Sequence, residues 1–558
     1  MIFKRFLSVT FLIFLFSSII VAQEEILVLN PSSAIDTTTF INVQILADIA
    51  ANGGVIPANR VYELQRDAIH MHNSQITVNS GQTIRLRGQS GSGKKPIVYL
   101  YDAGTGTGRP PGNMFVLNGG DLHFKDICIA GYFEPIEDNV DGVQGGLINT
   151  TGAGSNITVD GVIFSNINGQ HIRTGFDVGK VDIRNTIFAN MGALTTSNLG
   201  AGKGIDFREA EIDTFILMNN TFVNYQDRAI RHYNFSNPHP DTGGTRIMHY
   251  ALIEHNTFIN GMGYHGLLSL GNVGEQITIK NNLFVDGFAL GEDSSDAVRK
   301  AEWANTGEFY PTGGNRITWI FTAQNQVTNW DISNNYFAIS DSGQSFLNDY
   351  GFGPASPLSW HINSRIGADS VTAFTQIPLT LNNTPRLMTN MMRWYETPEA
   401  QGGAGKTKNT GNFIREEHDY DRRVIQYYRD TLNGSYPTSS VAYTGGSDGK
   451  PVGDLNWFPT FLDVNDNYVM PTTFTLEQNY PNPFNPSTKI VFYLDKSGIT
   501  NLNVYNVLGQ KVATLVAGDL NVGLHEINFD ASNLSSGIYF YKLESGVNST
   551  VKKMMLVK

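Results

Sequence analysis

The chain has 558 residues and a formal net charge of −12, with 41% hydrophobic and only 16% charged residues. This length allows two or three domains and a large core, and the negative charge argues against nucleic acid as a partner, although a local basic patch could still bind an acidic sugar. The single cysteine, Cys128, excludes an intrachain disulfide, so a long hydrophobic core has to stabilise the fold.

The N-terminus predicts export from the cytoplasm. Lys4 and Arg5 precede a nearly continuous apolar run from residue 6 to 21, and a polar break follows. A basic start, a short apolar run and a small residue before a polar segment are typical of a signal peptide. The run is shorter than the roughly 20 residues that a membrane span needs. We therefore expect residues 1–23 to be a signal peptide.

A repeated pattern over residues 24–340 predicts a parallel β-helix. Alternating apolar residues lead to an Asn or a related residue, a Phe and a second Asn, and the repeated aromatic residues are Phe164, Phe188, Phe222, Phe258, Phe284 and Phe337. Two positions after most of them stand Asn166, Asn190, Asn224, Asn260 and Asp286. Stacked rungs place equivalent residues about 4.8 Å apart, so both sets should form columns. The predicted fold class is all-β, a right-handed parallel β-helix followed by a small C-terminal β-sandwich.

The two ends of the repeat have their own patterns. Residues 45–50 predict a short helix that caps the first rung, which would otherwise expose strand edges. Residues 341–471 lose the repeat, and within them residues 387–395 and 422–432 have a helical pattern. We expect this region to form the C-terminal cap and loops packed against the stack.

Residues 472–558 predict a separate β-sandwich, because short strands alternate with turns of Gly, Asn and Ser. Its motifs are Asn-Tyr-Pro-Asn-Pro-Phe-Asn-Pro at 479–486, Val-Tyr-Asn-Val-Leu-Gly-Gln at 504–510, Leu-Ser-Ser-Gly-Ile-Tyr at 534–539 and a basic end at 552–558. They resemble the type A sorting domain of the type IX secretion system. The resemblance implies the secretion machinery as a partner and a secreted or cell-surface location in a Gram-negative bacterium.

One outer face of the predicted helix gathers basic and aromatic residues. If Ile172, Ile205 and Ile230 stack in the core, strand alternation turns the next positions outward. These positions are His171, Arg173, Asp206, Arg208, Arg231, Tyr233 and His265. The face is either a salt-bridge ladder, in which Asp206 pairs with both neighbouring arginines, or a groove for an acidic polysaccharide. The same alternation turns His232 inward.

A second resemblance suggests an activity for this face. Residues 220–226, followed by Arg231 and His232, resemble the chondroitinase B and alginate lyase family of β-helix lyases, within the pectate-lyase-like superfamily. That family places a catalytic Lys one rung before its Arg-His pair; Arg208 falls near that position here and Lys203 is five residues away. The resemblance implies a uronate-polymer lyase acting by β-elimination. Its catalytic residues would be Arg231, Arg208, His232 and Lys203, and its substrate-binding residues Arg173, Asp206, Tyr233, His171 and His265.

Two other functions stay open at this point. One is a non-catalytic carbohydrate-binding or cell-surface protein of the same fold, and the other is a glycoside hydrolase, for which Asp206 and Asp227 would be the two carboxylates. Calcium binding stays open, because Glu292, Asp293 and Asp296 cluster in a loop. The sequence identifies no ligand set, so we assign no metal site. We expect a monomer that binds an acidic polysaccharide and no nucleic acid.

Overall fold

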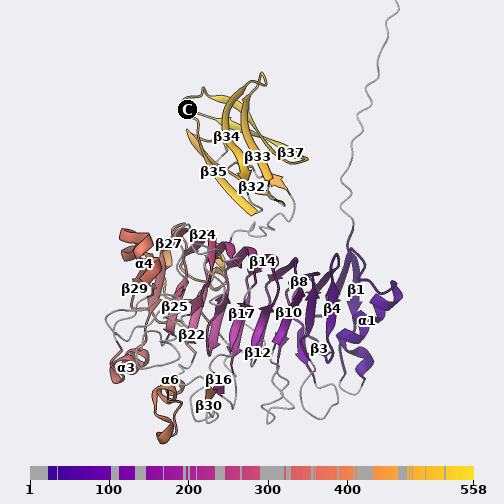
Figure 1. The fold of residues 1–558 in the computed structure, drawn as a ribbon, viewed down its shortest axis with the longest axis vertical. Coiled ribbons are helices and arrows are strands. Elements are labelled where there is room, and N and C mark those ends of the chain that lie inside the picture. The colour runs from indigo at the N-terminus through magenta and orange to yellow at the C-terminus, as the bar shows by residue number, and fades with distance from the viewer. Residues whose placement is uncertain are drawn as a thin grey trace, which may run out of the picture.

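A computed structural model gives the structure of the chain (Figure 1). It describes residues 23–33, 36–101, 112–131, 146–167, 169–192, 197–198, 202–208, 210–232, 246–263, 267–289, 320–321, 328–352, 357–358, 360–385, 389–405, 409–410, 432–462, 474–476, 478–479, 482–494, 496, 498–520 and 523–558.

Three long parallel sheets form the right-handed β-helix that the repeat predicts, and most rungs contribute one strand to each sheet. Sheet 1 contains β1 (Glu25–Leu29), β2 (Arg60–Leu64), β5 (Thr83–Gly88), β8 (Asp121–Lys125), β11 (Ser155–Asp160), β14 (Val178–Arg184), β18 (Ile212–Met218), β21 (Met248–Glu254), β24 (Val273–Lys280) and β27 (Asn329–Ser333). Sheet 2 contains β3 (Ile69–His72), β6 (Ile97–Leu100), β9 (Cys128–Ala130), β12 (Ile163–Ile167), β15 (Ile187–Met191), β19 (Thr221–Tyr225), β22 (Thr257–Gly263), β25 (Leu283–Ala289), β28 (Asn335–Ala338) and β29 (Phe374–Gln376). Sheet 3 contains β4 (Ile76–Asn79), β7 (Phe115–Asn118), β10 (Gly146–Gly152), β13 (Gln170–Thr174), β17 (Lys203–Arg208), β20 (Ile230–His232), β23 (Leu268–Ser269) and β26 (Ile320–Phe321).

The predicted Phe column is confirmed on the inner face of sheet 2. All six Phe residues pair in register on successive strands. The ring of Phe222 stacks on Phe188 with centroids 4.6 Å apart and on Phe258 with centroids 5.2 Å apart. Offset stacking of this kind adds to the free energy of burying each ring, so the column holds neighbouring rungs together.

The predicted Asn column is also confirmed, at the turn between sheets 2 and 3. Each of its residues has a left-handed backbone conformation, with φ between 51° and 57°, and Asn tolerates this conformation better than most residues. The side chains form a chain of hydrogen bonds along the stack: Asn190 Nδ2 donates to Asn166 Oδ1, and Asn224 Nδ2 donates to Asn190 Oδ1. The column therefore satisfies buried amides as well as shaping the turn.

Helices cover both ends of the stack. The predicted N-terminal cap is α1 (Ile41–Ala51), whose Ile41 and Ile45 join the main hydrophobic core. At the other end the predicted helix at 387–395 is α6 (Thr389–Glu396), and it joins α3 (Asp341–Asp349), α4 (Trp360–Ile366) and α5 (Ser370–Ala373). Residues 422–431 of the other expected helix lie outside the described residues. The sequence analysis did not identify β1, which adds a strand to sheet 1 before residue 60, or β29, which extends sheet 2 beyond residue 340.

Residues 432–462, which we name the arm, cover the outer face of sheet 2. Apolar residues of the arm such as Tyr436, Val452 and Phe458 pack with a row of outward side chains from β6 to β25, and Cys128 lies in this row as a buried apolar residue. Polar residues of the arm bind the turn between sheets 1 and 2: Asp454 Oδ2 accepts from Thr221 Oγ1, and Asp454 N donates to Thr257 Oγ1. The arm, although far away in the sequence, therefore ties neighbouring rungs together.

The C-terminal residues form the predicted antiparallel sandwich. One sheet contains β31 (Thr475–Leu476), β32 (Ser487–Leu494) and β35 (Gly523–Asp530), and the other contains β34 (Lys511–Leu520), β33 (Gly498–Asn506), β36 (Gly537–Ser545) and β37 (Asn548–Leu556). The two sheets enclose a separate core that includes Phe492, Val504 and Tyr541. Outside the sandwich, a further short pair, β16 (Ser197–Asn198) and β30 (Asn409–Thr410), joins the segment between β15 and β17 to the segment after α6.

Candidate functional site

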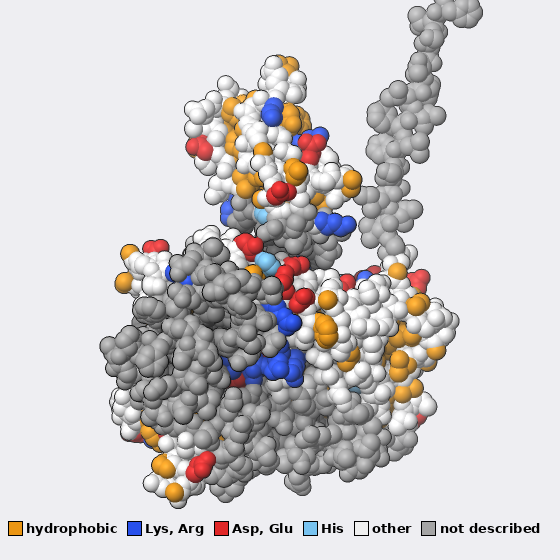
Figure 2. Space-filling model, in the orientation of Figure 1, with side chains coloured by type: hydrophobic (Ala, Val, Ile, Leu, Met, Phe, Trp, Pro, Cys, Tyr) orange, Lys and Arg blue, Asp and Glu red, His pale blue; other side chains and the backbone are white. Residues whose placement is uncertain are grey.

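The outer face of sheet 3 brings together the predicted arginines. Ile172, Ile205 and Ile230 pair in register and are buried, as expected. The next position on these strands gives the row Arg173, Asp206 and Arg231 on β13, β17 and β20. We name Arg173, Asp206, Arg208 and Arg231 the arginine face. Figure 2 shows Lys and Arg side chains gathered over the middle rungs of the visible face.

Asp206 and Arg231 form a two-point ion pair at the centre of the arginine face. Arg231 Nε donates to Asp206 Oδ1 and Arg231 Nη2 donates to Asp206 Oδ2, each at 2.6 Å. Burial alone would raise the pKa of the Asp206 carboxyl, but the Arg231 guanidinium outweighs it and holds that pKa below its ordinary value. A salt bridge at this position was expected if the face is a salt-bridge ladder, and the pair links two neighbouring rungs.

Arg173 and Arg208 add positive charge on either side of this pair. Both side chains are partly exposed, and neither forms an ion pair or a side-chain hydrogen bond with any residue that the structure describes. Arg208 ends β17 in a left-handed conformation, with φ of 49°. Burial and the nearby Arg208 guanidinium lower the pKa of Arg173, yet a guanidinium stays charged at neutral pH. The arginine face thus has three guanidinium groups and one carboxylate.

Lys203 belongs to a buried ionic network instead of the exposed face. Its Nζ lies 2.8 Å from Asp227 Oδ2, and its side chain is 1% exposed. Arg228 Nε donates to the same carboxylate oxygen at 3.0 Å, and its Nη1 donates to Ser269 Oγ. Burial lowers the pKa of Lys203 to about 8, although the Asp227 charge opposes the shift.

The expected outward position of His171 is wrong. Its side chain is buried, and its ring lies 5.4 Å from the Phe164 ring and 5.7 Å from the Phe188 ring, measured between centroids. The strand begins at a corner of the rung, where simple alternation does not hold. Gly204 occupies the equivalent position on β17, and a Cβ there would lie 2.6 Å from a ring carbon of Phe222. Burial lowers the pKa of His171 to about 3.

His232 faces inward, as strand alternation predicted. It is buried, its Nε2 lies 3.0 Å from the carbonyl oxygen of Ala210, and burial lowers its pKa to about 4. A neutral, enclosed imidazole in this position supports the rung. Tyr233 and His265 lie outside the described residues, as do Glu292, Asp293 and Asp296.

The two carboxylates considered for a glycoside hydrolase do not suit that chemistry. Burial alone would raise the pKa of Asp227, but Arg228 and Lys203 hold it at about 2, and the pKa of Asp206 is also lowered. A hydrolase needs one carboxyl that keeps its proton until it protonates the leaving group. Both groups are ionised and paired with cations, so neither provides that proton.

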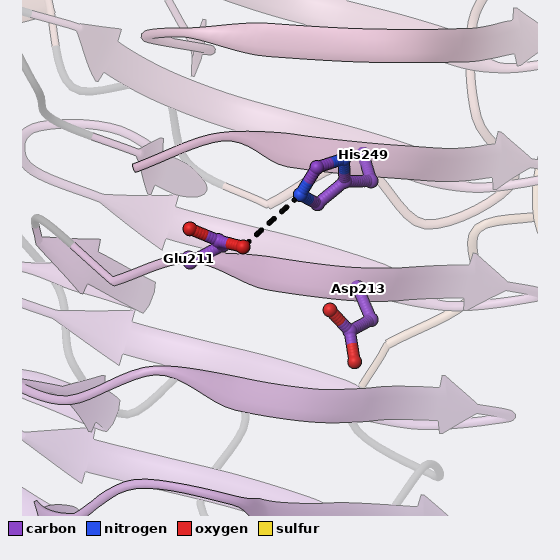
Figure 3. Close-up of side chains that lie close together, drawn as sticks. All are labelled: Glu211, Asp213 and His249. Atoms are coloured by element: carbon purple, nitrogen blue, oxygen red, sulfur yellow. Dashed lines mark hydrogen bonds and ion pairs between the residues drawn. The ribbon is translucent and has the colours of Figure 1, made fainter. Parts of the chain in front are cut away.

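A second polar site lies at the start of the sheet 1 strands, and the sequence analysis missed it. Glu211, Asp213 and His249 place one ligand atom each within 4.8 Å of one another (Figure 3). Glu211 and Asp213 also line a groove of about 620 Å³ that reaches Arg85, on β5. The sequence did contain a sign of this site, because Asp213 and His249 each stand nine residues before one of the repeated Phe residues. Glu275, on the next rung, has the same spacing.

These features define an all-β protein in which a parallel β-helix precedes a small antiparallel sandwich. Residues 478–558, which include β32 to β37, match the secretion system C-terminal sorting domain. A comparison with curated proteins finds no match. The match confirms the sorting assignment and indicates that the type IX secretion system of a Gram-negative bacterium carries the chain to the cell surface or beyond.

Several expectations about the rest of the chain stay predictions. The matched range starts six residues after the expected boundary at 472. The expectations that stay predictions are the likeness to pectate-lyase-like proteins, the signal peptide at 1–23 and the monomeric state. Among the described residues, no helix is long and apolar enough to span a membrane.

Proposed function

We propose that the secreted protein binds an acidic polysaccharide built from uronate sugars through its arginine face. The observation that carries this proposal is the pair of partly exposed guanidinium groups, Arg173 and Arg208, that form no ion pair with a described carboxylate. A guanidinium presents a planar fork of donors that fits a carboxylate. The two residues lie on neighbouring strands, and strands in a sheet are about 4.8 Å apart.

The Asp206–Arg231 pair supports this binding role by fixing the face. Because its charges already neutralise each other, the positive charge available to a ligand comes from Arg173 and Arg208. A local positive field in an acidic protein attracts an acidic polymer and leaves neutral glycans unbound. The polymer should therefore bind more weakly as salt is added.

Cleavage of the bound polymer by β-elimination is a second candidate function, favoured by one observation. Burial lowers the pKa of Lys203 to about 8, and a neutral amine is a competent base for the proton at C5 of a uronate. Guanidinium groups would neutralise the carboxylate of the same sugar. The Lys203 side chain is 1% exposed, however, and ion-paired with Asp227, so binding has the stronger support.

Affinity electrophoresis of the full chain tests the binding proposal. Gels would contain alginate, polygalacturonate or a neutral β-glucan. We expect retardation by a uronate polymer, little effect of the glucan, and loss of retardation in the double variant Arg173→Gln/Arg208→Gln. The matched control, Lys94→Gln/Lys125→Gln, removes two positive charges from exposed positions elsewhere on the β-helix. Relative to its own mobility in a gel without polymer, it should be retarded as much as the parent.

Two outcomes would overturn the proposal. One is no retardation of the parent by either uronate polymer at low salt. The other is equal loss of retardation in the control, which would indicate general charge and no defined face. Absorbance of unsaturated uronate product, measured on the same samples, separates cleavage from binding: product formation that Lys203→Met abolishes supports the lyase, and binding without product supports the binding protein.

A further inference from the structure

Three potential metal ligands converge where two neighbouring rungs begin on sheet 1. Glu211 precedes β18, Asp213 is the second residue of β18, and His249 is the second residue of β21. The register of the two strands places Asp213 beside His249, because Ile212 pairs with Met248 and Thr214 pairs with Tyr250. Their ligand atoms lie within 4.8 Å of one another, and in Figure 3 the side chains of Glu211, Asp213 and His249 lie close together.

A bulge in the next rung aims a fourth residue at the same imidazole. Met248 pairs with Val273 and Tyr250 with Gln276, so Gly274 and Glu275 of β24 both lie opposite His249. A Cβ on Gly274 would lie 2.9 Å from His249 Cα and 2.8 Å from a methyl group of Ile247. Glycine therefore permits the close approach, and bulges of this kind redirect side chains near functional sites.

The two nitrogens of His249 have different neighbours. Nδ1 lies 2.9 Å from Glu275 Oε2, whereas Nε2 lies 3.2 Å from Glu211 Oε1 on the side where Asp213 also lies. A histidine that binds a metal through one nitrogen commonly donates its other N–H to a carboxylate, which fixes the ring. Glu275 has the place of that orienting carboxylate, and Nε2 faces the other two ligands.

An unsatisfied hydroxyl lines the groove next to these residues. Thr214 follows Asp213, its side chain is buried, and its Oγ1 has no hydrogen-bond partner among the described residues. Thr214 lines the same groove as Glu211 and Asp213. A buried hydroxyl without a partner is costly, so Thr214 offers a hydrogen-bonding group to a ligand or a metal-bound water at this end of the groove.

We propose that Glu211, Asp213 and His249 bind one divalent transition-metal ion, with Glu275 as the positioning residue. One imidazole nitrogen and two carboxylates suit Zn²⁺ or Mn²⁺, whereas Ca²⁺ prefers a larger set of oxygen ligands. Three protein ligands leave a coordination position open toward the groove for water or a sugar hydroxyl. The site goes beyond the proposed function, since none of its residues belongs to the arginine face.

Metal binding to the full chain tests this inference after treatment with a chelator. Co²⁺ serves as the probe because its visible absorption reports the ligands directly, and Zn²⁺ should displace it from a single site. We expect His249→Gln and Asp213→Asn each to abolish the Co²⁺ spectrum. Glu275→Gln should weaken Zn²⁺ binding by about 10- to 100-fold, as for other outer-sphere partners of a ligand histidine. The control His123→Gln changes a histidine that lines the same groove but lies outside the cluster, so binding should not change.

The inference fails if the parent protein binds neither Co²⁺ nor Zn²⁺, or if Asp213→Asn and His249→Gln bind them as the parent does. It also fails if excess Ca²⁺ displaces Co²⁺ as readily as Zn²⁺ does. The folding of each variant is checked by circular dichroism. If His249→Gln does not fold, Asp213→Asn decides the result, because Asp213 is partly exposed and its replacement is nearly isosteric.

Discussion

The inner and outer faces of the same strands follow different rules. Inside, a single residue type repeats from rung to rung, as the stacked Phe residues of sheet 2 show. Outside, equivalent positions hold different residues, such as Arg173, Asp206 and Arg231 on sheet 3. Repetition holds the stack together, and variation at a fixed spacing places unlike charges next to one another. The contrast indicates that the interior carries the stability and the exterior carries the chemistry.

The largest expected effect is on the interior. Phe222→Ala removes a ring that stacks on both sides with Phe188 and Phe258. We expect a loss of about 3–5 kcal/mol in the free energy of unfolding, as for truncation of a buried aromatic residue. Urea denaturation followed by circular dichroism measures it. A loss below about 1 kcal/mol would mean that the column does not hold the rungs together.

Arg231 tests whether an outer residue can also be structural. Arg231→Ala leaves the buried Asp206 carboxylate without its two-point partner. Breaking a buried ion pair from one side costs about 3 kcal/mol or more. The melting temperature should therefore fall clearly. An unchanged melt together with lost polymer binding would assign Arg231 to the ligand instead of the rung.

A second amide ladder, formed by Asn220, Asn256 and Asn282 at the turn between sheets 1 and 2, should give a smaller loss. Asn256 Nδ2 donates to Leu217 O and to Asn282 Oδ1, while its Oδ1 accepts from Asn220 Nδ2. Asn256→Ala leaves buried partners unsatisfied, and we expect a loss of about 2 kcal/mol. The control Asn118→Ala removes an exposed Asn–Asn hydrogen bond and should change stability by less than about 0.5 kcal/mol. Equal losses would show that burial of the ladder does not matter.

Acid should lower the stability of the β-helix because its buried histidines become protonated when the chain unfolds. Burial lowers the pKa of His171 to about 3 and that of His232 to about 4, whereas a histidine in the unfolded chain has its ordinary value of 6.5. Stability from these groups is therefore complete above pH 6.5 and is lost as the pH falls to about 4 for His232 and about 3 for His171. At pH 5 each should cost about 2 kcal/mol. Thermal melts at pH 7.5 and 5 measure the loss.

The variant His171→Phe isolates one of these groups. It keeps an aromatic ring beside Phe164 and Phe188 but removes the titrating nitrogen atoms. The difference between the melts at the two pH values should shrink. If it stays as large as in the parent protein, His171 does not contribute to the acid sensitivity.

The smallest expected effect is on the exposed arginines. Arg173→Gln/Arg208→Gln should change the free energy of unfolding by less than about 0.5 kcal/mol, because neither side chain has an ion-pair partner among the described residues. The same double variant should lose polymer binding. A large destabilisation would place these residues with the structural interior and remove the contrast between the two faces.

Repetition explains which parts of the fold could be predicted from the sequence. The Phe and Asn columns follow from residues that return in phase, and the sandwich strands follow from alternation between turns. β1 was missed because the segment that contains α1 separates it from β2, so its residues do not return in phase with the later rungs. Loops of residues 341–471 packed against the stack were expected, but the sequence did not indicate that the arm covers sheet 2, because residues 432–462 contain no repeat.

The candidate site was predictable only where strands are regular. Alternation placed Arg173, Asp206 and Arg231 in one row, but it failed for His171 at a corner of the rung. Alternation from the inward Ile205 turns Lys203 inward as well, but it gave no sign of the ion pair with Asp227, which depends on packing between rungs. The cluster at His249 was missed because its members differ in type, although their spacing from the repeated Phe residues is constant.

The arm has a consequence for cooperativity. A solenoid held only by contacts between adjacent turns can open from its ends, one turn at a time. Asn456 Nδ2 donates to Asn185 Oδ1 and to Asn219 O, and Ser447 N donates to Asn281 Oδ1, so one segment fastens turns made from distant parts of the chain. A segment that binds several turns makes them unfold together instead of one at a time from the ends. The arm also follows every turn in the sequence, so the newly made solenoid stays open to partial unfolding until the arm is in place.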